Sequence, residues 1–478
     1  MKHQFYLWVS IVVCFFPGVL SVSSKQIVQP CFSEDYDPLV DVEVTVQIQK
    51  IRALDKQDFQ VFQRSYVDRT SDPDFCVKII INDVEFVSTI WRDTTYIYEP
   101  DFSATLNVPD DQEFVTVKIQ LWDWNDDGDV LCDIGNQTDD VTLSYSIKTG
   151  RWTGDDRYGD PSGYGRLNGC DDGHIYGGRR DAEIWFTIFQ NDFDGDSAPY
   201  WVEVYEYSTN PEIDDRATDI DHDAVLFSWE HYWGYNPGTA ENHQTMDPDH
   251  DSLNNIEEYL TSQWGSDPFR KDLFVELDEM AGPDGIRLVF PPEAKELLYT
   301  AYNRYNIVYH LDDGSWDQTG SEMVPYQAAS DWDDLDMIYY NYFLHGSGDN
   351  WRRGVFHYGV LVYNCVVAGG NAFGSNRFQI SAKFLEEKAA LPLLRRDIVY
   401  ASAYMHETGH TLGFYPIGGH DENSKYPWQL GWWKWRPYKS CMNYGYMYQM
   451  VDYSDGSRPV NDFNDWERMD LIYFERNW

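Results

Sequence analysis

The stretch DIVYASAYMHETGHTL, residues 397–412, carries the most informative pattern in the chain. Its apolar side chains recur every three or four positions, which predicts a helix that is opened by Asp397 as N-cap and is buried along one face. On this helix a separation of four residues places His406 and His410 on the same face, one turn apart. Two imidazoles placed in this way can reach a single metal ion.

Glu407 directly follows the first histidine and completes the pattern HExxH. A catalytic zinc ion uses three protein ligands and keeps one position open for water, and a neighbouring carboxylate can take the proton of that water. We therefore expect zinc on His406 and His410, with Glu407 as the general base of a hydrolysis. The alternative is a pair of surface histidines on an ordinary helix.

Two features downstream of this motif give it a context. Gly413 follows His410 by three residues, and SCMNY lies at 440–444. With HETGH these segments resemble the metzincin zinc peptidases over residues 271–478, and secreted archaeal and bacterial members most of all. The resemblance implies a Met-turn in which Met442 lies beneath the metal, and a Tyr444 that moves onto and off the zinc. Without it, both would be ordinary core residues.

The third zinc ligand is where this sequence departs from the family pattern. The usual position of the third histidine, three residues after the glycine, is Pro416. His420 is the next histidine along the chain, and a turn enlarged by Gly418 and Gly419 could bring it back to the ion. We expect His420 as the third ligand, with the neighbouring carboxylate of Asp421 as the alternative.

Strand and helix patterns alternate around the motif, from residue 269 to residue 478. Apolar, β-branched runs at 271–280, 306–314, 352–363 and 378–385 predict strands of one sheet, and 292–305 predicts a helix. We expect an α/β (α+β) catalytic domain in which an open sheet edge near Phe378 to Phe384 pairs with an extended polypeptide substrate.

Residues 191–268 contain a repeat of acidic loops. DFDGDSAPYWVE (192–203), DIDHDAVLFSWE (219–230) and DPDHDSLNNIEE (247–258) place Asp at positions one, three and five and Glu at position twelve. This is EF-hand ligand spacing, although the usual glycine at position six is missing, and the second loop could instead be the start of a packed helix. The third loop also resembles calcium repeats of secreted microbial proteins. The expected calcium ligands are Asp192, Asp194, Asp196, Glu203, Asp219, Asp221, Asp223, Glu230, Asp247, Asp249, Asp251, Asn255 and Glu258.

The N-terminal part divides into a secretory signal at residues 1–23 and an all-β sandwich at 24–190. Strand patterns occur at 42–51, 75–81, 114–122 and 182–189. The acidic segments at 71–79 and 121–135 resemble the calcium loops of C-two-type sandwiches, which often bind lipid headgroups; solvated loops without an ion are the alternative. The matching positions are Asp72, Asp123, Asn125 and Asp133.

Composition sets limits on the partners. The 478 residues carry a formal net charge of −44, so this chain would repel nucleic acid, whereas cations suit it. Six cysteines remain after the signal, an even number that predicts disulfides in an exported chain. We expect a monomeric secreted zinc endopeptidase that acts on polypeptides. The rival is a calcium-dependent surface-binding or adhesion protein with a structural or inactive metal site.

Overall fold

The computed structural model describes most of the chain from Val42 onward. The chain divides into two compact units, Met1–Asp37 and Pro38–Trp478. The expected signal segment and Cys31 lie outside the described residues. No helix in the described part is both long and apolar enough for a membrane crossing. The described residues are 42–54, 72–109, 113–125, 128–156, 164–175, 180–314, 322–366, 369–373, 376–414 and 417–471.

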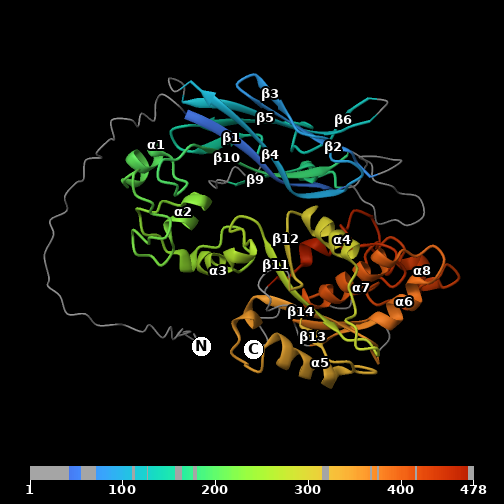
Figure 1. Cartoon of the computed structure of the whole chain (residues 1–478). Helices are drawn as coiled ribbons and strands as arrows, with labels where there is room; N and C mark the ends of the chain where they lie inside the picture. Colours follow the sequence, from blue (N-terminus) through green and yellow to red (C-terminus); the bar gives the residue numbers. More distant parts are fainter. Residues whose placement is uncertain are drawn as a thin grey trace, which may run out of the picture. The chain divides into compact units, whose positions relative to one another are not determined.

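Two sheets form an N-terminal β-sandwich, as the alternating sequence pattern predicts (Figure 1). One sheet has the order β4-β1-β10-β9 and the other has the order β3-β2-β5-β7-β8, with β6 paired to β5. Inward-facing side chains of both sheets, such as Val44, Val77 and Ile184, share one buried cluster. The strands are β1 (Val42–Ala53), β2 (Phe75–Ile81), β3 (Val84–Val87), β4 (Tyr96–Val108), β5 (Phe114–Asp123), β6 (Val130–Leu131), β7 (Val141–Ser146), β8 (Arg151–Gly154), β9 (Tyr164–Asn168) and β10 (Ala182–Gln190).

The acidic loops that follow the sandwich alternate with short helices. A buried cluster of Val225, Trp229, Trp233 and Tyr235 gives this segment its own small core. Asn254 caps the third helix through a capping box with Glu257. The elements are α1 (Tyr200–Val202), η2 (Glu203–Tyr207), α2 (Phe227–Trp233), η3 (His243–Thr245), α3 (Asn255–Thr261) and η4 (Ser262–Trp264).

The C-terminal part is built on one mixed sheet with the order β12-β11-β14-β16-β15, and β13 pairs with β11. β12, β11, β14 and β16 run parallel, whereas β15 runs antiparallel to β16. Every residue of β11 and of β14 is buried, as expected for parallel strands covered on both faces. The strands are β11 (Asp272–Met280), β12 (Val308–Asp312), β13 (Met323–Val324), β14 (Phe356–Val362), β15 (Gly370–Phe373) and β16 (Arg377–Ser381), and the helices include α4 (Pro292–Asn303), α5 (Trp332–Ile338), α6 (Ala382–Ala389), α7 (Arg396–Thr411) and α8 (Leu430–Trp435).

The open edge of this sheet is β15, which corrects the expectation that the edge lies near Phe378 to Phe384. Phe378 and Ile380 belong to β16, which is paired on both sides and is buried. The strand expected to run to residue 385 ends at Ser381, whose side chain accepts a hydrogen bond from the backbone N–H of Phe384 and caps α6.

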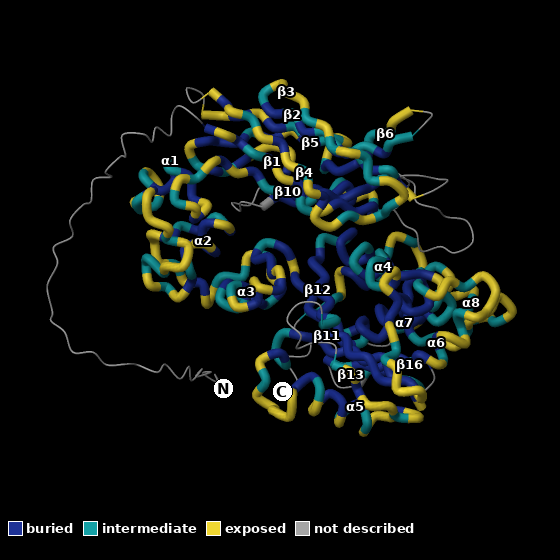
Figure 2. Tube along the Cα trace, in the orientation of Figure 1, coloured by how far each residue is buried: buried dark blue, intermediate teal, exposed yellow. Residues whose placement is uncertain are grey.

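Helix α7 carries the HExxH motif and is buried nearly all round (Figure 2). It begins at Arg396, so Asp397 lies in its first turn and is not the N-cap. Every residue from Ile398 to Gly409 is buried, rather than a single face. The strands of the sheet pack against one side, and C-terminal residues such as Met442 and Tyr453 pack in the same core. A helix enclosed in this way holds its polar side chains in fixed positions.

The sandwich and the C-terminal part are joined by buried polar contacts. The guanidinium of Arg166, which is 1% exposed, donates to the backbone carbonyl of Asn303 at 3.0 Å. Arg304 donates to the carbonyl of Leu54 at 2.6 Å. Because breaking such buried pairs leaves unsatisfied groups, the two parts support each other.

Two of the six expected disulfide partners are free thiols in the structure, namely Cys76 and Cys441. Cys441 is fully buried next to His406 of the HExxH motif, and burial raises the pKa of its thiol. The prediction that all six cysteines pair is therefore wrong for these two positions.

Candidate metal centre

Two imidazoles and a carboxylate converge at the C-terminal end of α7. Nε2 of His406 lies 3.2 Å from Nε2 of His410 and 3.3 Å from Oδ1 of Asp421. Nε2 of His410 lies 3.8 Å from the same oxygen. The three residues therefore form a cluster with metal-ligand chemistry. Spacing on the helix brings the two histidines together, as predicted, while the carboxylate comes from a loop.

Hydrogen bonds orient the two rings toward a common point. Nδ1 of His406 lies 2.9 Å from the backbone carbonyl of Cys441, so Nδ1–H donates to it and the lone pair of Nε2 points to the cluster. The backbone carbonyl of Phe414 accepts a hydrogen bond from His410 in the same manner. Such second contacts fix the tautomer and the orientation of metal-binding histidines.

The cluster has the dimensions that a zinc ion requires. Bonds of about 2.1 Å in tetrahedral geometry separate the ligand atoms by about 3.4 Å, and the three observed separations bracket that value. Oδ1 of Asp421 is buried and faces both rings. A cation suits a position where a buried carboxylate oxygen and two imidazole nitrogens converge.

Charges around the cluster are strongly coupled. Burial by itself would raise the pKa of Asp421, but the imidazoles of His406 and His410 outweigh it and lower this pKa to about 2. Burial lowers the pKa of His410 to about 4, so its ring is neutral and available as a ligand at neutral pH.

Glu407 lies beside the cluster, 4% exposed, under the edge strand β15. Burial raises its pKa to about 7, in spite of the attraction of His406 and a hydrogen bond from the backbone N–H of Ala372. A carboxylate with a pKa near the working pH can both take and return a proton, which general acid–base catalysis requires.

Met442 packs against α7, and Tyr444 packs against His406. The sulfur of Met442 is buried against α7 so closely that a Cβ at Gly409 would stand 2.7 Å from it, which explains the glycine within HETGH. The ring of Tyr444 stacks on that of His406 at 5.5 Å, and its hydroxyl hydrogen-bonds to Asp421. Tyr444 therefore contacts two of the three candidate ligands.

His420 does not reach the cluster, and the preference for it as third ligand is corrected to Asp421. Its ring is buried against Tyr438 at 5.4 Å, and Nε2 lies 3.4 Å from Oδ1 of Asp465. Asp421 adopts a left-handed φ of 50°, and its backbone N–H donates to the carbonyl of Met442. This backbone turn points neighbouring side chains in different directions, so the carboxylate meets the imidazoles and His420 enters the core.

All three acidic loops gather carboxylates as the EF-hand spacing predicts. The ligand atoms of Asp192, Asp194, Asp196 and Glu203 all lie within 4.8 Å of one another, and similar groups are formed by Asp219, Asp221 and Asp223 and by Asp247, Asp249 and Asp251. Burial and neighbouring carboxylates raise the pKa values of Glu203 and Asp249 to about 9. The buried oxygens that accept no hydrogen bond are Asp192 Oδ1, Asp194 Oδ2, Glu203 Oε2, Asp247 Oδ1, Asp249 Oδ2 and Glu258 Oε1.

The missing glycines do not change the turn at loop position six. Ser197, Ala224 and Ser252 adopt left-handed φ values of 81°, 83° and 83°. An EF-hand loop uses glycine at this position for its sharp turn. The turn is therefore present in all three loops with a non-glycine residue, and the doubt that the sequence raised about loop geometry is removed.

Sequence reasoning missed a second acidic position in each repeat. The backbone N–H groups of Asp215, Glu241 and Asp272 donate to Oδ2 of the position-five aspartates Asp196, Asp223 and Asp251, respectively. These residues lie 18 to 21 positions after their partners and outside the loop motif. Aligning the repeats beyond position twelve could have found them.

Asn255 is placed differently from the prediction that it binds calcium in the third loop. Its side-chain nitrogen lies 3.0 Å from Nδ1 of His243, a residue of the preceding repeat. The amide is buried in the first turn of α3. Asn255 is therefore corrected to a partner of His243.

Two of the four acidic and amide positions assigned to the sandwich, Asp123 and Asp133, accept hydrogen bonds from protein donors. Oδ1 of Asp123 accepts from the backbone N–H of Asp74 at 2.9 Å, and Oδ2 accepts from Asn125 at 3.1 Å. Oδ1 of Asp133 accepts from the backbone N–H of Gly135. Asp72 lies in the bend before β2. The hydrogen bonds from Asp74 and Asn125 satisfy both carboxylate oxygens of the fully buried Asp123.

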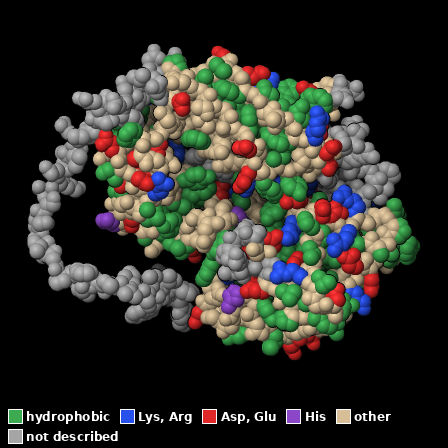
Figure 3. Space-filling view, in the orientation of Figure 1, with side chains coloured by type: hydrophobic (Ala, Val, Ile, Leu, Met, Phe, Trp, Pro, Cys, Tyr) green, Lys and Arg blue, Asp and Glu red, His purple; other side chains and the backbone are tan. Residues whose placement is uncertain are grey.

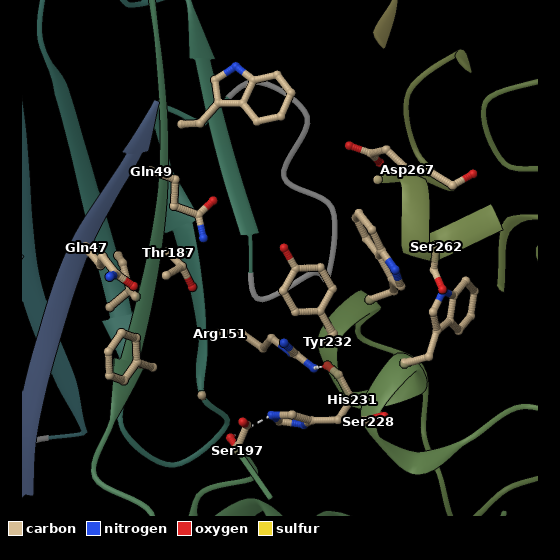
Figure 4. A pocket seen from close by; sticks show the side chains of 18 of the residues that line it. Gln47, Gln49, Arg151, Thr187, Ser197, Ser228, His231, Tyr232, Ser262 and Asp267 are labelled. Carbon is tan, nitrogen blue, oxygen red and sulfur yellow. Dashed lines mark hydrogen bonds between the residues drawn. The ribbon is translucent and has the colours of Figure 1, made fainter. Parts of the chain in front are cut away.

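A cavity of 810 Å³ lies away from this centre, between the sandwich sheet and the acidic-loop helices (Figure 4). Arg151 donates to the backbone carbonyl of His231, and Nε2 of His231 lies 3.0 Å from the carbonyl of Ser197. The cavity thus adjoins the first acidic loop rather than HExxH. On the face shown in Figure 3, Lys and Arg side chains lie among acidic ones.

Comparison with known proteins gives only distant structural likenesses. No protein-family profile and no curated protein matches the chain. A C2 domain matches 31% of this chain and 98% of its own, with 10% identity and a TM-score of 0.19. A C2 domain of plant extended synaptotagmin 1 matches 31% and 94%, with 15% identity and a TM-score of 0.20. Calcium-bound extended synaptotagmin 2 matches 32% and 45%, with 11% identity and a TM-score of 0.20. TM-scores of this size support no structural argument. The assignment of a β-sandwich depends on the observed strand pairing alone.

Proposed function

We propose that this chain is a secreted zinc-dependent endopeptidase of the metzincin type. The observation that supports this most is the convergence of His406, His410 and Asp421 next to the buried carboxylate of Glu407. An ordinary surface helix would not bury these groups together, because each polar group loses water.

His406, His410 and Asp421 would hold the zinc ion. Zinc, when bound, polarises the scissile carbonyl and lowers the pKa of the attacking water. Glu407 takes the proton from that water and returns it to the leaving amine. Burial keeps the carboxylate of Glu407 in a water-poor site, and the N–H of Ala372 holds it in place. Tyr444, whose hydroxyl bonds to Asp421, is placed to position the carboxylate ligand.

The substrate class follows from the sheet edge above Glu407. β15 pairs with β16 along one side and is the last strand of the sheet order. An extended polypeptide can add to such an edge through backbone hydrogen bonds, which recognise peptide irrespective of its side chains. A polypeptide bound along this edge would bring its scissile bond to the metal cluster, and this supports an extended polypeptide segment as the substrate.

We assign calcium to the first and third acidic loops as a stabilising cofactor. Both loops present all-oxygen donor sets with buried oxygens that lack hydrogen-bond donors, the chemistry that calcium prefers. The secretory signal expected at residues 1–23 fits a calcium-rich extracellular setting. The sandwich would contribute a surface that holds the enzyme near its substrate, with calcium and lipid contact at the exposed Asp72 as a further proposal, and we expect a monomer.

The rival function is a calcium-dependent binding protein whose zinc site is structural. The acidic loops fit both functions, so they do not discriminate. The carboxylate of Glu407 discriminates between the two functions, because a structural zinc site is closed to water and needs no base beside it. Retention of a buried Glu407 with a pKa near 7 favours the enzyme.

The test is hydrolysis of labelled casein by the purified full chain. We expect stoichiometric zinc, casein cleavage at internal bonds, loss of activity with phenanthroline and recovery on adding zinc back. Zinc-loaded, folded chain that leaves casein and a set of unstructured peptides intact would reject the peptidase and leave the binding protein.

A further inference from the structure

The second acidic loop differs from the other two because a buried histidine, His243, lies against its carboxylates. Nε2 of His243 lies 3.2 Å from Oδ2 of Asp223 and 3.7 Å from Oε1 of Glu230. Oε2 of Glu241 lies 3.9 Å from the same nitrogen. The second loop also brings together the carboxylates of Asp219, Asp221 and Asp223, but its group around His243 combines nitrogen and oxygen donors.

Among the atoms that converge here, Oδ2 of Asp223 accepts a backbone hydrogen bond from Glu241 at 3.1 Å, whereas the other donor atoms have none. The side chains of His243 and Glu230 are fully buried, and neither Nε2 nor either oxygen of Glu230 has a hydrogen-bond partner. Oε2 of Glu241 likewise accepts none. Buried polar atoms that converge in this way without donors are unfavourable unless a cation lies between them.

The ring of His243 is held rigidly in the orientation that a ligand needs. Trp229 and Tyr235 meet it edge-to-face, at 5.8 Å and 5.0 Å between ring centres. Nδ1 lies next to the amide of Asn255, whose oxygen has no partner. Turning that amide by 180° lets its oxygen accept from Nδ1–H, which leaves the lone pair of Nε2 free for a metal.

We propose that Asp223, Glu230 and His243, with Glu241 beside them, form a binding site for a divalent transition metal such as Zn²⁺ or Co²⁺. Imidazole nitrogen binds borderline metals well, whereas calcium takes oxygen donors almost exclusively. The ligand separations of 3.2 to 3.9 Å suit metal bonds of about 2.1 Å. The site is separate from the HExxH cluster and would give the acidic-loop segment a metal that calcium does not replace.

Cobalt binding in a chain without the catalytic imidazoles tests this site. The full chain carrying His406→Ala and His410→Ala is loaded with Co²⁺ in millimolar Ca²⁺, passed over a desalting column and analysed for metal. We expect one cobalt per chain to remain. Adding His243→Gln should remove it, whereas adding His222→Asn should not, because His222 is an exposed residue of the same loop and Asn tolerates its left-handed φ of 69°.

Two results would overturn the proposal: a chain that keeps calcium but no cobalt, or cobalt that survives His243→Gln. If His243→Gln does not fold, the paramagnetically shifted imidazole N–H resonance of the cobalt-loaded background chain decides, since its presence supports the site and its absence rejects it. If the chain carrying His406→Ala and His410→Ala does not fold, the wild-type chain is loaded with cobalt instead. We then expect two cobalt ions per chain, and a single cobalt ion would reject the site.

Discussion

Gly370 on the edge strand β15 lies so close to Glu407 that a Cβ at Gly370 would stand 2.7 Å from Oε1 of that carboxylate. The same Cβ would meet the backbone carbonyl of Gln379 at 2.8 Å, so the strand has no room to withdraw. The missing side chain thus lets the edge strand cover the candidate base.

Gly370→Ala should therefore lower peptidase activity without removing zinc. The added methyl group displaces the carboxylate of Glu407, and a misplacement of about 1 Å can lower the rate by about 100-fold. Gly354→Ala is the control, because nothing lies within 4 Å of a Cβ at that position. The measurement is kcat/KM with zinc content, and equal activity of the two variants would refute the role of this contact.

Asp421→Ala should lose most of its zinc, whereas His420→Ala should keep it. The carboxylate of Asp421 faces both imidazoles, while the ring of His420 bonds to Asp465 in the core. His420→Ala should instead lower the melting temperature, because it leaves a cavity and a buried carboxylate with one partner fewer. Metal analysis of both purified variants checks this, and zinc loss in His420→Ala alone would restore His420 as the ligand.

Calcium should raise the melting temperature by several degrees, since ions bound only by the folded chain stabilise it by about 2.7 kcal/mol at 100 times the Kd. Glu203→Gln should reduce this gain, because the buried oxygen of Glu203 lacks a donor. Glu206→Gln is the matched control on an exposed side chain. The measurement is thermal unfolding of the zinc-loaded chain in calcium and in a calcium-selective chelator. The same melting temperature under both conditions would contradict calcium binding by the acidic loops.

His357 should make the fold less stable as the pH falls. Burial lowers its pKa from 6.5 to about 3, and it is 1% exposed. Between pH 7 and pH 5 the unfolded chain binds a proton at this ring that the folded chain does not, so stability falls by about 2 kcal/mol. We expect urea titrations at the two pH values to show that the free energy of unfolding of His357→Gln falls by about 2 kcal/mol less than that of the wild type. An identical loss in both proteins would show that His357 titrates normally.

Strands with regular alternation could be predicted from the sequence, as β1, β2, β5 and β10 show. β4 could not, although it is the longest strand described, because Glu99 and Asp101 adopt a left-handed φ of 50° within it and Pro100 lies between them. These residues shift the register against β1 and interrupt the alternation that the pattern depends on.

The candidate site could be predicted where it depends on local spacing. His406, Glu407 and His410 share one helix, so the period of the helix brings them together. Asp421 lies in an irregular loop, where one left-handed residue decides which of two neighbouring side chains meets the two imidazoles. His243 joins the second loop only through tertiary packing against Trp229, which no spacing rule contains.

The central claim is most directly tested by casein hydrolysis with the Glu407→Gln variant, measured together with its zinc content. Glutamine keeps the volume of the side chain and leaves all three metal ligands in place, but it cannot accept the proton of the water. We expect zinc at the wild-type level and a rate lower by about 100-fold or more. Zinc-loaded Glu407→Gln with activity within about tenfold of wild type would contradict the account, because a general base contributes more than that.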